Sequence, residues 1–227
     1  MVNRELVAAI RTMLMERADP ARAAGAQSYM KSSIRSLGVR VPEVRRCVVA
    51  AAAAFPLESP EQLRATVLLL WREAQWREEQ YAAIDLTGLR LVAQDSLMLP
   101  VYDEIIRTGA WWDFVDGVRP RICGLLLAHR ALMTPLLLEW STDEDFWIRR
   151  AAITSQLKAE SATDTDLLRA TIEANVGDPE FFVRKAIGWA LREFAKTNPA
   201  WVRDFVAEHA AQLSPLSRKE ALRHLNP

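Results

Sequence analysis

The two segments that decide the fold are DEDFWIRRAAI at residues 143–153 and DPEFFVRKAIG at residues 178–188. They are offset by 35 residues and match in residue type at most positions: an acidic turn, aromatic residues, an aliphatic residue, Arg or Lys, and Ala. About the same step backwards leads to AWWDFVDGV at residues 110–118, and a second step leads to WREEQYAAI at residues 76–84. A period of this size is typical of helical repeat proteins, in which each helix pair buries its apolar side against its neighbours.

The rest of the chain also follows the helical period, and no alternating strand pattern persists. Breaks are indicated at ADP, GVRVP, FPLESP, MLP, VRP, MTP, GDP, TNP and LSP, several of which place proline at a helix start. They predict roughly a dozen helices of about 10–18 residues. The recurring segment resembles the second helix of a HEAT repeat. We therefore expect an all-α solenoid of about six HEAT-like repeats, forming one domain over residues 1–227.

Charge is balanced over the whole chain but uneven along it. The 227 residues include 29 Lys and Arg and 29 Asp and Glu, so the formal net charge is zero. Residues 31–46 hold five basic residues against one acidic, residues 57–104 hold four against nine, and residues 181–227 hold eight against four. The total does not indicate a nucleic-acid binder, yet basic ends and an acidic middle still allow a positive face.

Several classes of site are not indicated by the sequence. Cys47 and Cys123 are far apart, which predicts neither a disulfide framework nor a zinc site and favours a reducing compartment. The histidines show no metal-ligand spacing. The start, MVNRELVAAIRTMLMER, has the pattern of an amphipathic helix instead of a signal peptide, and the apolar runs are too short to span a bilayer. We expect a cytoplasmic protein with no metal, no cofactor and no membrane contact.

The segment EFFVRKAIGWALREFAKTNP at residues 180–199 carries two stripes at helical spacing. The predicted buried stripe is Val183, Ile187, Leu191 and Phe194. The opposite stripe is Lys185, Trp189, Arg192 and Lys196. This second stripe is interpreted either as a solvated basic face with an incidental tryptophan or as a phosphate-contacting face with an aromatic platform. Gly188 costs about 1 kcal/mol relative to Ala inside a helix, which close approach of another backbone would explain.

A second candidate lies in AWWDFVDGV, where Asp116 follows Trp112 by one helical turn. Side chains four residues apart on a helix meet, so a carboxylate lies beside an indole, which is useful where a cation must be held. Asp113 is explained by its place in the first turn, where the helix dipole favours a carboxylate. Trp111 and Val115 share another face and are predicted to be core.

Two adjacent arginines in FWIRRAAITSQLK form the third candidate. Arg149 and Arg150 project about 100° apart on a helix, so they cannot share one partner face. One of them is expected to link neighbouring repeats, as in HEAT ladders. The other is free to point into the concave wall of a solenoid.

These three segments, AWWDFVD, FWIRRAAI and FFVRKAIGWALREFAKTNP, together resemble the DNA alkylation repair family of AlkD-like HEAT-repeat DNA glycosylases. The resemblance runs from about Tyr29 to the C-terminus and is strongest over residues 110–220. It implies a right-handed solenoid that binds duplex DNA in a concave, positively charged cleft. It also implies hydrolysis of the N-glycosidic bond of cationic lesions such as N7-methylguanine and N3-methyladenine.

Carried over by position, the resemblance implies a catalytic role for Asp116 with Trp112 and Trp189. The implied or expected DNA-binding residues are Arg150, Lys185, Arg192, Tyr29, Lys31 and Lys196. No lysine is evidently placed for Schiff-base chemistry, so we expect a monofunctional enzyme that removes the base only. The expected partner is double-stranded DNA with alkylated purines, bound by a monomer associated with the bacterial nucleoid. The alternatives are a non-catalytic DNA-binding module of the same fold and a protein scaffold.

Overall fold

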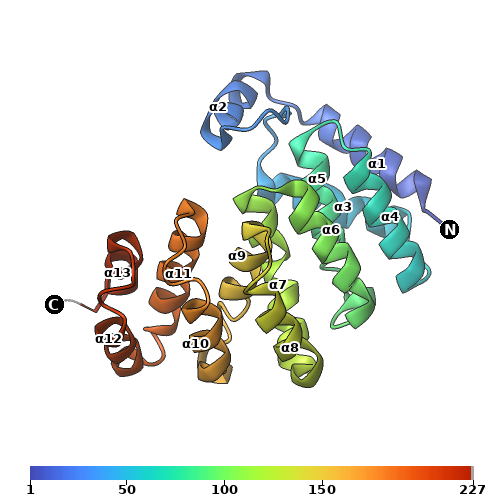
Figure 1. Ribbon diagram of the computed structural model, residues 1–227. Helices are drawn as coiled ribbons and strands as arrows, with labels where there is room; N and C mark the ends of the chain where they lie inside the picture. Colours follow the sequence, from blue (N-terminus) through green and yellow to red (C-terminus); the bar gives the residue numbers. More distant parts are fainter. Residues whose placement is uncertain (226–227) are drawn as a thin grey trace. The chain divides into compact units, whose positions relative to one another are not determined.

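The computed structural model describes residues 1–225, and all regular secondary structure in this part of the chain is helical (Figure 1). It contains thirteen α-helices and three short 3₁₀ helices, and no strand occurs within residues 1–225. The prediction of an all-α fold with about a dozen helices is confirmed, although three helices, α9, α10 and α13, are shorter than the expected length. No helix in the described range is both long and apolar enough to cross a bilayer.

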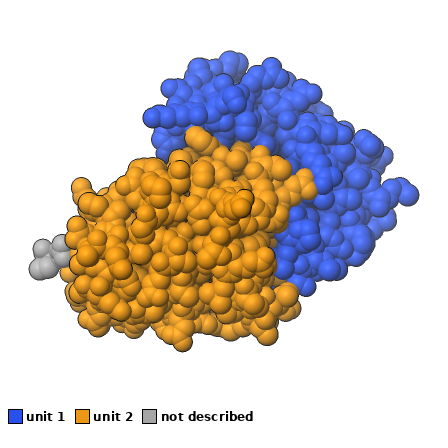
Figure 2. Space-filling view, viewed as in Figure 1, with its two compact units in different colours: residues 1–101 blue, residues 102–227 orange. Residues whose placement is uncertain are grey.

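The contacts group the chain into two compact units, residues 1–101 and residues 102–227 (Figure 2). The division falls within α6 (Leu99–Gly109). A single domain over residues 1–227 stays a prediction.

The first unit contains α1 (Arg4–Glu16), α2 (Pro20–Met30), α3 (Val41–Ala54), α4 (Pro60–Arg72) and α5 (Arg77–Leu86). Two 3₁₀ turns follow, at Arg90–Val92 and Ser96–Met98. Helix α3 packs on α1 and α5, and α4 packs on α5. The core between them is built from fully buried aliphatic side chains, including Leu6, Ile10, Val44, Leu63 and Leu70.

The described part of the second unit, residues 102–225, contains seven further helices. They are α7 (Trp112–Ala128), α8 (Arg130–Trp140), α9 (Phe146–Thr154), α10 (Thr165–Glu173), α11 (Phe181–Phe194), α12 (Pro199–Glu208) and α13 (Pro215–Ala221). Helix α7 contacts α9, α9 contacts α11, and α11 contacts α13, so these four form one row, which we call the odd-helix row. Helices α8, α10 and α12 pack against one side of this row and lie below it in Figure 1.

Proline marks helix starts where a capping residue precedes it. Helices α2, α4, α12 and α13 each have proline in the first turn, and the side chains that accept a hydrogen bond from their first turns are Asp19, Ser59, Asn198 and Ser214. Proline has no N–H to lose at this position, and its fixed φ suits the first turn. The breaks predicted at these four sites are therefore confirmed.

The breaks predicted at VRP and MTP are wrong. Pro120 lies inside α7 and Pro135 lies inside α8. An interior proline removes one helix hydrogen bond and costs about 3 kcal/mol or more. Helix α7 continues because its apolar face is buried along its whole length, through Phe114, Val115, Val118, Ile122, Leu125 and Leu126. Tertiary burial outweighs the local penalty.

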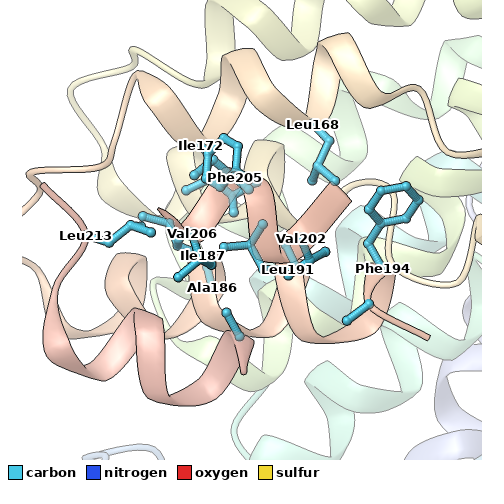
Figure 3. Packing of buried hydrophobic residues seen from close by; sticks show 14 of the residues in the cluster. Leu168, Ile172, Ala186, Ile187, Leu191, Phe194, Val202, Phe205, Val206 and Leu213 are labelled. Carbon is cyan, nitrogen blue, oxygen red and sulfur yellow. The ribbon is translucent and has the colours of Figure 1, made fainter. Parts of the chain in front are cut away.

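The buried stripe predicted on α11 is confirmed and forms the centre of the C-terminal core (Figure 3). Val183, Ile187 and Leu191 are fully buried, and Phe194 is nearly so. They pack with buried residues of α10, α12 and the segment after it, including Leu168, Ile172, Val202, Phe205 and Leu213. This packing leaves the half-buried residues Lys185, Trp189 and Arg192 on the other side of α11.

Gly188 explains how closely α11 and α13 approach. A Cβ built on Gly188 would lie 2.6 Å from the Glu220 Cβ and 3.0 Å from the Ser217 carbonyl oxygen. The sequence interpretation of this glycine as a backbone contact is therefore confirmed. The contact brings α13, and with it Glu220, against the polar face of α11.

Gly188→Ala is expected to destabilise the protein although alanine favours helices. Overpacking costs about 1–3 kcal/mol, which exceeds the gain of about 1 kcal/mol in helix propensity. Gly124→Ala is the matched control, because a Cβ added at Gly124, in the middle of α7, would meet no atom within 4 Å. Urea unfolding should show that Gly188→Ala is less stable than the parent and that Gly124→Ala is at least as stable. A stabilised Gly188→Ala would contradict the close approach.

The two repeat copies start with the same turn and the same ion pair. Asp143 binds Arg107 at 2.7 Å, and Asp178 binds Arg149 at 2.8 Å, so each turn is held by an arginine from an earlier repeat. Each aspartate also accepts a hydrogen bond from the backbone N–H two residues further on, at 2.8 and 2.7 Å. Arg149 is thus the arginine that links the repeats.

Candidate active site

An aromatic cluster forms where α7, α9 and α11 begin. Trp147 lies 4.8 Å from Phe182 between ring centroids, and Trp111 lies 6.1 Å from Trp147 and 5.8 Å from Phe182. These aromatic positions recur in the sequence repeat, which explains why the tilted rings lie side by side. Val115 is fully buried, as predicted, and Trp111 is half-buried within the cluster. The cluster ties together the first turns of three helices of the odd-helix row.

Asp116 and Arg150 form a two-pronged ion pair across α7 and α9. The Arg150 Nε and Nη2 atoms donate to Asp116 Oδ1 at 3.1 and 2.9 Å, and Nη2 also donates to Oδ2 at 2.9 Å. The remaining Nη1 donates to the Phe182 carbonyl at 2.8 Å, at the start of α11. Planar pairing of this kind fixes both position and orientation of a carboxylate. Asp116 is therefore held by Arg150 of α9, which is itself fixed by the first turn of α11.

The carboxylate of Asp116 remains accessible from one side. Its side chain is 16% exposed, whereas that of Arg150 is 6% exposed. Burial raises the pKa of Asp116 above its usual value of 3.8, and the ion pair with Arg150 acts in the opposite direction. The arrangement presents carboxylate oxygen in a partly desolvated setting, where its charge acts strongly on any group that reaches it.

Trp189 lies beside this pair, with a second arginine over its ring. The Arg150 guanidinium carbon is 6.0 Å from the Trp189 ring centroid, and that of Arg119 is 4.8 Å away. Arg119 was not among the residues predicted from the sequence. The sequence feature that could have identified Arg119 is its position on α7 three residues after Asp116, because this spacing puts both side chains on the same side of the helix.

Lys185 and Arg192, predicted on the polar stripe of α11, both contact Glu220 of α13. The Lys185 ammonium is 3.0 Å from Glu220 Oε1, and Arg192 bonds Glu220 Oε2. The hydrogen bond from Lys185 is the main reason why the pKa of Glu220 is lowered. The stripe is therefore less positive than its residues suggest, because one carboxylate serves two cations.

The remaining predicted residues lie in different places. Trp112 is the half-buried first residue of α7, one turn before Asp116. Lys196 is exposed and pairs with Glu193 at 2.7 Å. Tyr29 and Lys31 are exposed and belong to the first unit, at the end of α2, where Lys31 adopts a left-handed φ of 49°. The structure brings together Asp116, Arg150 and Trp189, with Lys185 and Arg192 on the same row.

Potential metal ligands gather at another place in the second unit. In the part of the chain that the structure describes, Glu173, Glu208 and His209 offer ligand atoms within 4.8 Å of one another. Arg169 already pairs with both carboxylates, at 3.0 and 2.9 Å. Its guanidinium offsets part of the negative charge of the two carboxylates.

The fold and the site define a class: an all-helical repeat protein with a carboxylate presented between arginines beside a tryptophan. Within this class the chain belongs to the DNA alkylation repair enzyme family, whose model matches residues 10–225. No match was found among curated proteins.

Two solved structures place the chain among proteins of this kind. A predicted DNA alkylation repair enzyme from Enterococcus faecalis is 30% identical, with a TM-score of 0.82 over 92% of this chain and 97% of that one. AlkD2 from Streptococcus mutans is 15% identical, with a TM-score of 0.64 over 90% and 100%. The first supports the family, and the second supports the helical repeat fold.

Proposed function

We propose that this protein is a monofunctional DNA glycosylase that hydrolyses the N-glycosidic bond of cationic alkylated purines in duplex DNA. The observation that carries the proposal is the carboxylate of Asp116, held by Arg150 beside Trp189 in a chain of the DNA alkylation repair family. N7-methylguanine and N3-methyladenine are the substrates of this chemical class. We expect the enzyme to act as a cytoplasmic monomer on the bacterial nucleoid.

The substrate explains why one carboxylate suffices. An alkylated purine carries a fixed positive charge and leaves as a neutral base, so its departure needs no general acid. Hydrolysis of neutral glycosides, in contrast, uses a pair of carboxyl groups. The second carboxylate near the polar face of α11, Glu220, is engaged by Lys185 and Arg192 and is not required for the reaction.

Asp116 would act on the sugar. As the bond to the base stretches, positive charge develops on the deoxyribose, and a carboxylate nearby stabilises it. Two charges 4 Å apart at an effective dielectric constant of 20 attract by about 4 kcal/mol, which corresponds to roughly a thousandfold in rate. The positive charge of Arg150 weakens the attraction between the carboxylate and the sugar. In return, the ion pair fixes the orientation of the carboxylate. The same carboxylate is positioned to orient the attacking water.

The tryptophans would contact the sugar that becomes positive. An indole face attracts a desolvated cation by about 2 kcal/mol. Trp189 lies beside Arg150, which holds the carboxylate, and Trp112 begins the helix that carries Asp116. Basic residues of the odd-helix row would bind phosphates and set the register of the DNA without reading its sequence.

The test is release of free base from a duplex that contains a single N7-methylguanine. We expect the purified protein to release N7-methylguanine and to leave the strand uncut until the abasic site is cleaved by alkali. Undamaged duplex is the control and should release no guanine. Tight binding of DNA without base release would favour the alternative, a non-catalytic DNA-binding module. No binding of DNA would favour a protein scaffold.

A further inference from the structure

The cations of the odd-helix row differ in how far protein carboxylates neutralise them. All three nitrogens of Arg150 already donate to Asp116 or to the Phe182 carbonyl, and Lys185 and Arg192 share the Glu220 carboxylate. An arginine whose donors are already used by protein acceptors has little left for a phosphate. Arg150, which the sequence analysis assigned to the DNA backbone, holds Asp116 in this structure. Its contact with DNA stays a prediction.

Arg119 is the cation of this site without an acidic partner. Within residues 1–225 it makes no ion pair, and its Nε atom is buried without a hydrogen-bond partner. Its guanidinium carbon lies 4.8 Å from the Trp189 ring centroid. Burial lowers the pKa of Arg119, and the nearby charge of Asp116 opposes this. The buried Nε cannot reach a ligand, but within the described residues no acceptor bonds the terminal Nη1 and Nη2 atoms either, so these two groups are left for an acceptor from outside the protein.

We propose that Arg119 binds a phosphate of the DNA backbone next to the nucleotide that Asp116 faces. The proposal rests on the proposed function in that it takes DNA as the ligand. A guanidinium offers five N–H donors in a planar fork that matches phosphate oxygens. The stacking on Trp189 holds the fork in one orientation, so little freedom is lost on binding.

Charge at the site favours a phosphate over a cation as the partner of Arg119. Toward a phosphate further away, the Asp116 carboxylate and the Arg150 guanidinium carry no net charge as a pair, although a sugar at the site meets the more exposed carboxylate first. Arg119 adds a positive charge beside the pair. A carboxylate alone would repel the phosphates on either side of the deoxyribose. The unpaired guanidinium three residues further along α7 removes that repulsion and anchors the strand where the carboxylate must reach the sugar.

The test measures binding of undamaged, fluorescein-labelled duplex DNA by anisotropy over a series of NaCl concentrations. Each phosphate contact contributes about 0.9 to the slope of log K against log salt. Arg119→Ala should lower this slope by about one and weaken binding about tenfold at fixed salt. Arg119→Lys should keep the slope, because the charge remains. Arg203→Ala is the matched control, since Arg203 is an exposed arginine of α12, and it should change neither quantity.

The outcomes separate this inference from the proposed function, because binding is measured without base release. A lowered slope in Arg119→Ala supports the inference even if the parent protein releases no base. An unchanged slope in Arg119→Ala overturns the inference. Tighter binding by Arg119→Ala also overturns it, because the guanidinium would then block the site. No binding of duplex by the parent protein overturns both proposals. Circular dichroism shows whether Arg119→Ala folds. If it does not, Arg119→Gln replaces it, because glutamine keeps the side-chain stem on Trp189, and the slope of log K against log salt is measured for that variant.

Discussion

Replacing Asp116 with asparagine is expected to slow the release of N7-methylguanine at least about a hundredfold while duplex binding persists. Asparagine keeps the shape of the side chain and one oxygen that accepts from Arg150, but it loses the charge that stabilises the sugar. Removal of a single electrostatic contact to a transition state typically costs this much. The measurement is the single-turnover rate at saturating enzyme, which separates chemistry from binding.

Asp113→Asn is the matched control for this variant. Asp113 lies on the same helix, in its first turn, where the dipole explains a carboxylate. We expect its rate to stay within about threefold of the parent, because its role is local to the helix start. Equal rates for Asp116→Asn and the parent would remove the catalytic assignment.

Protonation of Asp116 is expected to set the decrease in rate on the acid side of the pH–rate profile. The reaction needs ionised Asp116, and burial raises its pKa above 3.8. The rate should therefore fall, as pH decreases, at a higher pH than an ordinary aspartate would produce. This limb should be absent from the residual rate of Asp116→Asn.

Arg150→Ala is expected to lower the free energy of unfolding by about 3 kcal/mol. The substitution leaves the desolvated Asp116 carboxylate without its partner and removes the donor to the Phe182 carbonyl. Base release at saturating DNA should fall as well, because the carboxylate is no longer oriented. Urea denaturation and the single-turnover rate together test both effects.

Arg107→Ala provides the comparison for Arg150→Ala. Arg107 also pairs with carboxylates, Asp103 and Asp143, but its side chain is 38% exposed. Exposed pairs contribute about 0–1 kcal/mol, so this variant should lose far less stability. If both substitutions lower the free energy of unfolding by the same amount, burial does not make the Asp116–Arg150 pair more important for stability than an exposed pair.

The secondary structure was predictable where its causes are local. Proline next to a capping residue starts a helix in any context, which is why α2, α4, α12 and α13 begin where predicted. The buried stripe of α11 followed from spacing alone. Pro120 and Pro135 were misjudged because burial of α7 and α8 against other helices outweighs the local cost of proline.

The sequence predicted several residues of the candidate site, but it did not predict which side chains pair with them. Asp116 and Trp189 stood out by spacing and residue type, whereas Arg119 did not, since an arginine in a helix is usually solvated. Whether a cation is free depends on carboxylates brought from elsewhere: Glu220 lies 35 residues from Lys185, and Asp116 lies 34 from Arg150. No local pattern encodes such distances.

The sequence by itself determined the helices, the repeat and the presence of a carboxylate one turn after a tryptophan, because these depend on residues within a few turns of one another. Only the tertiary structure decided how charge is distributed at the site. Close packing of α11 on α13 at Gly188 brings Glu220 to Lys185 and Arg192, and packing of α9 on α7 gives Arg150 to Asp116. Coulomb attraction depends on the distance between charges in space and not on their separation along the chain. That Arg119 has no acidic partner can therefore be seen only in the folded structure.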